Sequence, residues 1–143
     1  MERIDVAVVG GGVTGLATAR AIALGGFSTC VLERHPRPGL DTSTHNSGVI
    51  HAGIYYPART LKARLCGEGR HLMYEVCAKH AVPHERTGKI IVANDDHDTA
   101  ELEALLARGL ANGVEGLALV DASFVAAREP HVPSVAALYS PES

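Results

Sequence analysis

The first part of the chain alternates between apolar runs and a cluster of glycines. Ile4 and residues 6–9 form an apolar stretch that is typical of a strand buried on both faces of a parallel sheet. The glycine cluster GGGVTG follows at once, and the alanine-rich run LATARAIAL then predicts a helix that ends at Gly25 and Gly26. The segment STCVLE predicts a second strand, which ends at Glu33.

The second part of the chain predicts two longer helices and two further strands. Apolar residues at near-helical spacing predict a helix over residues 60–80, with an apolar stripe formed by Leu61, Leu65, Leu72, Met73, Val76 and Cys77. GKIIVAN predicts a strand. The following segment predicts a helix capped by Asp98 and stopped at residues 112–113, with an apolar face formed by Leu102, Leu105, Leu106 and Leu110. LALVD predicts a short strand, Asp121 a cap, and Pro130 the end of a short helix.

Composition narrows the class of protein. The chain has 143 residues, of which 46% are hydrophobic and 20% charged, as expected of a globular domain rather than a disordered segment. A net charge of -3 gives no basic field for nucleic acid, so no nucleic-acid partner is expected. The three cysteines have no CxxC spacing and indicate buried, reduced thiols. His80 and His84 are separated by Pro83, so no metal site is expected.

The chemistry of the N-terminus bears on localisation. Glu2 and Asp5 precede the first apolar run, unlike the basic start of a secretory signal. No run approaches the roughly 18 apolar residues of a membrane span. We therefore expect a soluble, cytoplasmic protein, and peripheral contact with the inner face of a membrane stays open.

The glycine cluster carries the clearest functional signal. Gly10, Gly12 and Gly15 occupy the positions of a GxGxxG motif between a predicted strand and a predicted helix. Glycines there permit a tight turn and let backbone N–H groups reach a pyrophosphate at the helix N-terminus. Glu33 stands where an acidic residue accepts hydrogen bonds from a ribose hydroxyl. The predicted dinucleotide contacts are Gly10, Gly12, Val13, Thr14, Gly15 and Glu33, with Arg34 beside the adenine or in solvent.

The next segment favours FAD over NAD. A nicotinamide-binding domain would proceed to another helix and strand, whereas this chain continues into HPRPGLDTSTHNSG, a turn-rich loop followed by hydroxyl and amide side chains. Such a loop suits the phosphates and ribityl chain of a flavin.

These residues also carry a family resemblance. THNSGVIHAGIYY followed by LKARLC resembles the signature of the L-2-hydroxyglutarate dehydrogenase/oxidase family, within the D-amino-acid-oxidase-like flavoproteins. GKIIVA and REPHV resemble segments that the family carries in the same order. The resemblance implies an FAD-dependent oxidoreductase that converts a 2-hydroxy acid, above all L-2-hydroxyglutarate, to the 2-oxo acid. The implied electron acceptor is oxygen or a quinone.

The resemblance also implies roles for single residues. His51 is the candidate acid/base, although a structural histidine beside the cofactor is an equal alternative. Tyr55 and Lys62 are candidate substrate contacts, against the alternatives of edge packing and a solvated helix face. The residues expected along the flavin are Thr44, His45, Asn46, Ser47, Gly48 and Val49, with His51, Ala52 and Gly53 close to its ring.

The predicted fold class is α/β. A Rossmann-like FAD-binding βαβ start occupies residues 1–80, and residues 81–143 begin an α+β substrate domain. Because the family is longer, we expect a fragment that lacks its C-terminal half, with a second polypeptide as the alternative. An FAD-dependent amine or amino-acid oxidase, an inactive nucleotide-binding fragment and an NAD-dependent dehydrogenase are the other readings of function.

Overall fold

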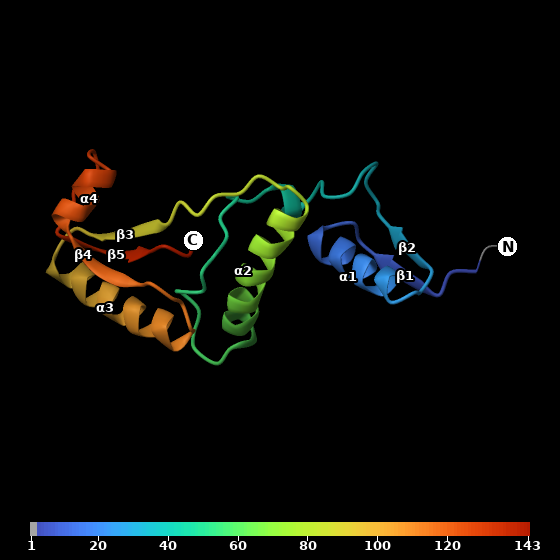
Figure 1. Cartoon of the computed structure of the whole chain (residues 1–143), viewed down its shortest axis with the longest axis horizontal. Helices are drawn as coiled ribbons and strands as arrows, with labels where there is room; N and C mark the ends of the chain where they lie inside the picture. Colours follow the sequence, from blue (N-terminus) through green and yellow to red (C-terminus); the bar gives the residue numbers. More distant parts are fainter. Residues whose placement is uncertain (1–2) are drawn as a thin grey trace. The chain divides into compact units, whose positions relative to one another are not determined.

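The computed structural model describes residues 3–143, which fall into two compact units, residues 3–48 and 49–143. Figure 1 shows the elements of each unit along the chain. The predicted division into an FAD-binding portion, residues 1–80, and the start of a substrate domain, residues 81–143, stays a prediction. Among the described residues, none of the helices is both long enough and apolar enough to span a membrane.

The first unit is a strand–helix–strand unit, as predicted. Its elements are β1 (Val6–Val9), α1 (Val13–Leu24), β2 (Thr29–Leu32) and the short 3₁₀ helix η1 (Thr42–Thr44). The two strands run parallel, with Val6 opposite Thr29 and Val9 opposite Leu32. Helix α1 packs on both strands, because the connection between two parallel strands must cross over the sheet.

Two details of the first unit differ from the prediction. The second strand ends at Leu32, one residue before Glu33. Strand β1 is not buried on both faces, since its residues alternate between partly buried and exposed and Val9 is 84% exposed. The reason is that a two-stranded sheet with one helix covers one face only within residues 3–48.

The second unit is a three-stranded antiparallel sheet with three helices. Strand β5 (Ala136–Ser140) lies between β3 (Lys89–Ala93) and β4 (Ala118–Asp121). Helix α3 (Asp96–Ala111) packs along all three strands, as Figure 1 shows for the C-terminal elements. The core of the unit lies between this helix and the sheet, and its buried residues are Ala52, Ile54, Ala93, Leu102, Val114 and Leu138.

Helix α2 (Leu61–Lys79) confirms the predicted helix but not the predicted buried face. Thr60 caps it, since the Thr60 hydroxyl accepts the N–H of Ala63 at 3.2 Å. The expected apolar stripe is largely exposed, with Leu61 63% accessible. Of that stripe only Cys77 is buried, and the other buried positions of the helix are Ala63, Arg70 and Tyr74.

The buried charge of this helix is paired. The side chain of Arg70 lies 3.6 Å from the Glu142 carboxylate, and Arg86 lies 3.2 Å from the same carboxylate. Arg86 also stacks over the Tyr74 ring at 4.2 Å from its centroid. A buried guanidinium requires a partner of this kind, because an isolated buried charge is strongly unfavourable. These contacts tie α2 to the residues that follow β5.

The remaining helix ends test the predicted caps. The cap of α3 is Asp95 and not Asp98, because the Asp95 carboxylate accepts the Asp98 N–H at 2.9 Å. Leu110, predicted on the apolar face of α3, is 57% exposed because it lies in the last turn. The prediction for helix α4 (Ala122–Arg128) is confirmed, since the Asp121 carboxylate accepts the Phe124 N–H at 2.9 Å.

Candidate functional site: a dinucleotide cradle and a histidine segment

The glycine turn of the first unit has a backbone that side chains would disrupt. Gly10 has a φ of 106°, a conformation that L-residues rarely adopt. Gly15 has a different constraint, because a Cβ there would overlap the carbonyl oxygen of Gly10. The two outer glycines of the motif therefore fulfil separate requirements, one of conformation and one of space.

The turn places the start of α1 at a cavity, and the first N–H groups of the helix are largely free of hydrogen-bond partners. Gly12 is the N-cap and makes no side-chain capping bond, and the first turn contains no acidic residue. The Val13 N–H donates to the Ser43 hydroxyl at 2.9 Å. A helix start without an acidic cap attracts anions, because its unpaired N–H groups and the helix dipole both favour negative charge.

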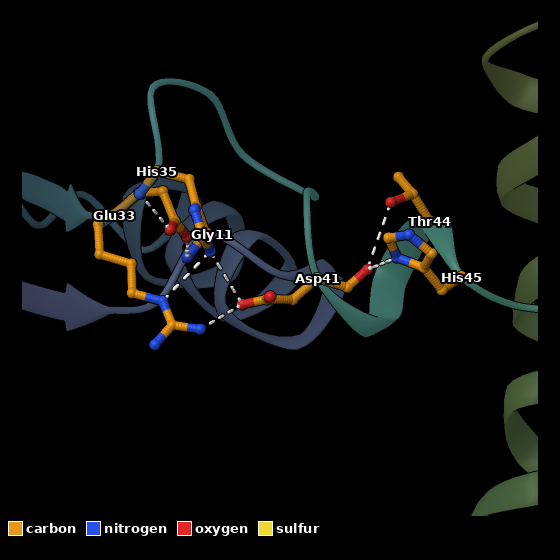
Figure 2. Close-up of polar contacts among 7 residues, drawn as sticks. Gly11, Glu33, His35, Asp41, Thr44 and His45 are labelled. Carbon is orange, nitrogen blue, oxygen red and sulfur yellow. Dashed lines mark hydrogen bonds and ion pairs between the residues drawn. The ribbon is translucent and has the colours of Figure 1, made fainter.

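Glu33 shapes this turn in addition to facing the cavity. Its carboxylate accepts the N–H of His35 at 2.9 Å and the N–H of Gly11 at 2.6 Å (Figure 2). The hydrogen bond from His35 and then that from Gly11 lower the pKa of Glu33 below its usual range. A carboxylate offers about four acceptor positions, so the predicted bond to a ribose hydroxyl remains compatible with both contacts.

The loop after β2 is held together around Asp41. Its carboxylate lies 2.9 Å from Arg34 and 3.3 Å from the Nε2 atom of His35 (Figure 2). The Arg34 bond, followed by the His35 bond, lowers the pKa of Asp41. The His35 Nε2 atom also lies 3.2 Å from Arg34 Nε, and it can accept that N–H or donate to Asp41 but not both. The pairing of Arg34 with Asp41 does not depend on this choice.

The backbone carbonyl of Asp41 organises the next residues. It accepts the Thr44 hydroxyl at 3.3 Å and lies 2.8 Å from Nδ1 of His45, which therefore carries the proton (Figure 2). Farther on, the Asn46 amide donates to the Ser43 carbonyl at 2.9 Å and accepts the Gly48 N–H at 2.8 Å. The polar groups expected along a flavin thus first stabilise their own loop. Their contact with the cofactor stays a prediction.

A cavity of about 400 Å³ lies among these groups, lined by residues 9–12, 32–34 and 39–43. It brings together the predicted Gly10, Gly12, Glu33 and Arg34. Asp41 and Ser43 also line it and were not among the predicted contacts. The signal for Ser43 was weak, because a serine in a polar loop says nothing of the helix start that it reaches. The glycine cradle, the open helix start and the acidic side chain together fit an adenine dinucleotide.

The histidine segment, residues 51–56, belongs to the second unit. Ala52 and Ile54 are 3% and 1% exposed and pack in the core, whereas His51 is exposed. The small size of Ala52 therefore has a packing reason. The His51 carbonyl accepts the Cys66 thiol at 3.2 Å, and burial raises the pKa of that thiol, which keeps it protonated as a donor.

The predicted substrate contacts also lie in the second unit. Lys62 places its ammonium 4.5 Å from the ring centroid of Tyr56, and both residues line a cavity of about 570 Å³ with Cys66. Tyr55 is 42% exposed, and burial of the rest of its side chain raises the pKa of its hydroxyl. Lys62 is thus in contact with Tyr56, the neighbour of the candidate Tyr55. Substrate binding by Tyr55 and Lys62 stays a prediction.

One group of potential metal ligands lies at the start of α3, where side-chain atoms of Asp95, His97 and Asp98 approach within 4.8 Å of one another. The structure gives both carboxylates another role. Asp95 accepts the Asp98 N–H as the helix cap, and Asp98 accepts the Asn94 N–H at 2.9 Å. Helix capping accounts for the arrangement.

A strand that leads through a glycine turn into an open helix start, with an acidic residue after the second strand, defines the nucleotide-binding start of a dinucleotide-dependent oxidoreductase. The family model described as FAD dependent oxidoreductase matches residues 5–143. The chain belongs to this family. FAD is therefore the cofactor class, as the loop after Glu33 indicated.

Curated relatives match nearly the whole chain. "L-2-hydroxyglutarate dehydrogenase, mitochondrial" from Nematostella vectensis is 44% identical over 99% of this chain and 32% of its own length. The protein of the same name from Arabidopsis thaliana is 42% identical over 99% of this chain and 29% of its own length. The chain thus spans about a third of the length of these relatives.

Solved structures share the fold. The L-alpha-glycerophosphate oxidase of Mycoplasma pneumoniae with FAD bound has a TM-score of 0.88 and is 32% identical, over 98% of this chain and 38% of that one. Glycine oxidase from Geobacillus kaustophilus has a TM-score of 0.84 at 21% identity, over 99% of this chain and 40% of that one. The second likeness shows the fold alone.

The names of the relatives correct the predicted localisation. We expected a cytoplasmic protein, and this is wrong, because the relatives from Nematostella vectensis, Arabidopsis thaliana and Pongo abelii are all named mitochondrial. The acidic residues near the N-terminus argued only against a secretory signal. Bulk composition does not separate the cytosol from the interior of an organelle.

Proposed function

We propose that this chain forms the cofactor-binding start and part of the reaction site of an enzyme that oxidises L-2-hydroxyglutarate to 2-oxoglutarate. The observation that carries the proposal is the 44% identity to an L-2-hydroxyglutarate dehydrogenase over 99% of this chain. That alignment includes both the glycine turn and the histidine segment. The proposal requires that both segments contribute to the reaction site.

The first unit would hold the cofactor. The N–H groups at the start of α1 suit the diphosphate, and the Glu33 carboxylate suits a ribose hydroxyl. Bound FAD supplies a two-electron acceptor for the hydride that leaves the α-carbon of the hydroxy acid. The first unit contributes binding and orientation to this reaction.

The second unit would handle the proton. Oxidation of a CH–OH group releases one hydride from carbon and one proton from oxygen, so a base must receive the proton as the C=O bond forms. His51 is our candidate, because its imidazole is exposed while its backbone is fixed through Cys66. The buried Ala52 and Ile54 anchor the backbone that follows it, which suits a group that must be oriented.

Lys62 and Tyr55 would bind the substrate. L-2-hydroxyglutarate carries two carboxylates, and an ammonium group attracts a carboxylate at long range and pairs with it on contact. The Lys62 ammonium already borders a cavity, where it lies over the Tyr56 ring. The Tyr55 hydroxyl could donate a hydrogen bond to the same ligand. The electrons would then pass to oxygen or a quinone.

The glycerophosphate oxidase supports a second candidate substrate. It is 32% identical to this chain, and its substrate by name is also an anionic secondary alcohol. α-Glycerophosphate is therefore the alternative to L-2-hydroxyglutarate. The two share the CH–OH group and differ in the anion, a phosphate in one and carboxylates in the other.

Anaerobic bleaching of the flavin spectrum tests the proposal. The FAD-loaded protein is mixed in turn with L-2-hydroxyglutarate, α-glycerophosphate and L-glutamate, which has the same carbon skeleton with an amine in place of the hydroxyl. We expect L-2-hydroxyglutarate to bleach the flavin and L-glutamate to leave it unchanged. Bleaching by L-glutamate alone would establish an amine oxidase and reject the proposal, and bleaching by α-glycerophosphate alone would establish the second candidate.

A variant at His51 separates binding from chemistry. His51→Asn keeps a side chain of similar size and polarity but removes the base, so the rate of bleaching should fall by about 10²–10⁴-fold while FAD remains bound. Bleaching at an unchanged rate would exclude His51 as the base and leave it as a structural histidine.

A further inference from the structure

The backbone carbonyls of the histidine segment receive hydrogen bonds from two helices, α2, which follows the segment closely in sequence, and α3, whose donors lie more than fifty residues away. Helix α2 supplies the Cys66 thiol, which donates to the His51 carbonyl at 3.2 Å. Helix α3 and its C-terminal end supply Arg108, which lies 3.4 Å from the Tyr55 carbonyl, and Asn112. Side chains thus satisfy carbonyls in a loop that forms no regular structure of its own.

Asn112 makes the shortest of these contacts. Its amide nitrogen lies 2.9 Å from the Gly53 carbonyl oxygen and 2.8 Å from that of Tyr56. Both partners can only accept, so the amide must direct its NH₂ group toward them and use both of its N–H bonds. One side chain thereby closes the loop from residue 53 to residue 56.

The position of Asn112 is itself fixed by the end of α3. The Val114 N–H donates to the Gly109 carbonyl and the Gly113 N–H to the Leu110 carbonyl, each at 3.0 Å, in a Schellman arrangement. Val114 is 3% exposed and belongs to the same core as Ala52 and Ile54. The donor and the loop are therefore both anchored in one packed cluster.

We propose that Asn112 is a positioning residue, which clamps the backbone of residues 53–56 and so fixes the direction of the His51 imidazole. The proposal rests on the proposed function of His51. His51 precedes the clamped turn, and the buried Ala52 and Ile54 prevent the chain from rotating about its own axis. Loss of the clamp would let the turn relax, and a displacement of about 1 Å at a reacting group can cost about 10²-fold in rate.

The test compares Asn112→Ala with Asn94→Ala in the FAD-loaded protein. Asn94 is an exposed asparagine near the opposite end of α3. Its side-chain amide makes only a 3.5 Å contact to the Asp98 carboxylate. In Asn112→Ala we expect hydrogen exchange of the amides of residues 52–56 to quicken by about tenfold, while exchange in β3 and β5 changes little. With L-2-hydroxyglutarate, kcat should fall by about tenfold or more and KM should change by less than about threefold. Asn94→Ala should show neither effect.

Each other outcome overturns the proposal. Unchanged exchange at residues 52–56 would show that Asn112 does not hold the segment. Equal acceleration throughout the second unit would indicate a purely structural role, and local acceleration with an unchanged kcat would show that the orientation does not matter to the reaction. If Asn112→Ala does not fold, Asn112→Ser keeps one donor and is read by the same criteria.

Failure of the proposed function can be told apart from failure of the clamp. If the unmodified protein does not oxidise L-2-hydroxyglutarate, the proposed function is rejected. The exchange comparison still decides whether Asn112 fixes the histidine segment, because that measurement needs no substrate.

Discussion

The glycine turn of the first unit and the histidine segment of the second are held in place by different means. The turn is built from its own backbone, since Gly10 supplies an unusual φ and Gly15 leaves room for the Gly10 carbonyl. The histidine segment is held by side chains that come from α2 and α3, above all Asn112. A turn formed by its own backbone requires particular residues close together, so it is visible as a short sequence motif. Contacts between segments that are separate in sequence produce no such motif.

We expect the largest effect from Gly15→Ala, which disrupts the glycine turn of the first unit. The added Cβ would overlap the Gly10 carbonyl oxygen, and overpacking of this kind costs about 1–3 kcal/mol, which at its upper end is a loss of about 10²-fold in FAD affinity. Titration with FAD followed by flavin fluorescence measures the change.

Gly69→Ala is the matched control for that variant. Gly69 lies inside α2, where an added Cβ meets nothing within 4 Å. This change should stabilise the helix by about 0.5–1 kcal/mol and leave FAD affinity unchanged. Equal FAD affinity in both variants would mean that the turn tolerates a side chain, contrary to the steric argument.

Gly53→Ala tests the second region through conformation alone. Gly53 has a φ of 101°, but a Cβ there would meet its nearest neighbours, the Cys66 side-chain atoms, only at 3.9 Å. We therefore expect a loss of about 1–2 kcal/mol in the free energy of unfolding, without a steric clash. Thermal unfolding monitored by circular dichroism measures it. A variant as stable as Gly69→Ala would show that the segment can change its backbone without cost.

Glu33→Gln has the smallest expected effect and a dependence on pH. The folded-state pKa of Glu33 lies below its unfolded value. Its contribution to the stability of the folded turn is therefore present above the unfolded pKa and is lost as pH falls through the folded pKa. Glutamine keeps only one strong acceptor for the N–H groups of Gly11 and His35, and FAD affinity at neutral pH should fall severalfold.

The acid side of the FAD affinity profile sharpens this test. The unmodified protein should lose affinity as Glu33 becomes protonated, whereas Glu33→Gln should be flat over the same range. Glu68→Gln is the control, because Glu68 is an exposed partner of Arg64 at 3.6 Å in α2. If the unmodified protein and Glu33→Gln lost FAD affinity equally at acid pH, another titrating group would be responsible for the loss.

Local signals in the sequence predicted most of the first unit. The GxGxxG spacing and the apolar runs around it determine β1, α1 and β2 to within three residues, because a strand, a tight turn and a helix start each demand particular residues in sequence. The burial of β1 was not predictable in this way. It depends on what covers the sheet, and periodicity within a strand carries no such information.

The second unit shows where local signals fail. The helix over residues 61–79 was predicted, but of its buried residues only Cys77 was. Arg70 is buried through pairing with Glu142, whereas a charged residue suggests exposure. Asp98 was predicted as the cap of α3, and only the folded backbone shows that Asp95 caps it instead. Asn112 appeared only as a helix stop, since its second role depends on carbonyls more than fifty residues earlier in the chain.

A crystal structure of the FAD-loaded protein with L-2-hydroxyglutarate bound would test the central claim most directly. We predict that the diphosphate lies at the N–H groups that open α1, that Glu33 accepts a hydrogen bond from a ribose hydroxyl, and that His51 lies within hydrogen-bond distance of the substrate hydroxyl. A diphosphate bound away from the glycine turn, or a His51 imidazole turned away from the substrate, would contradict it.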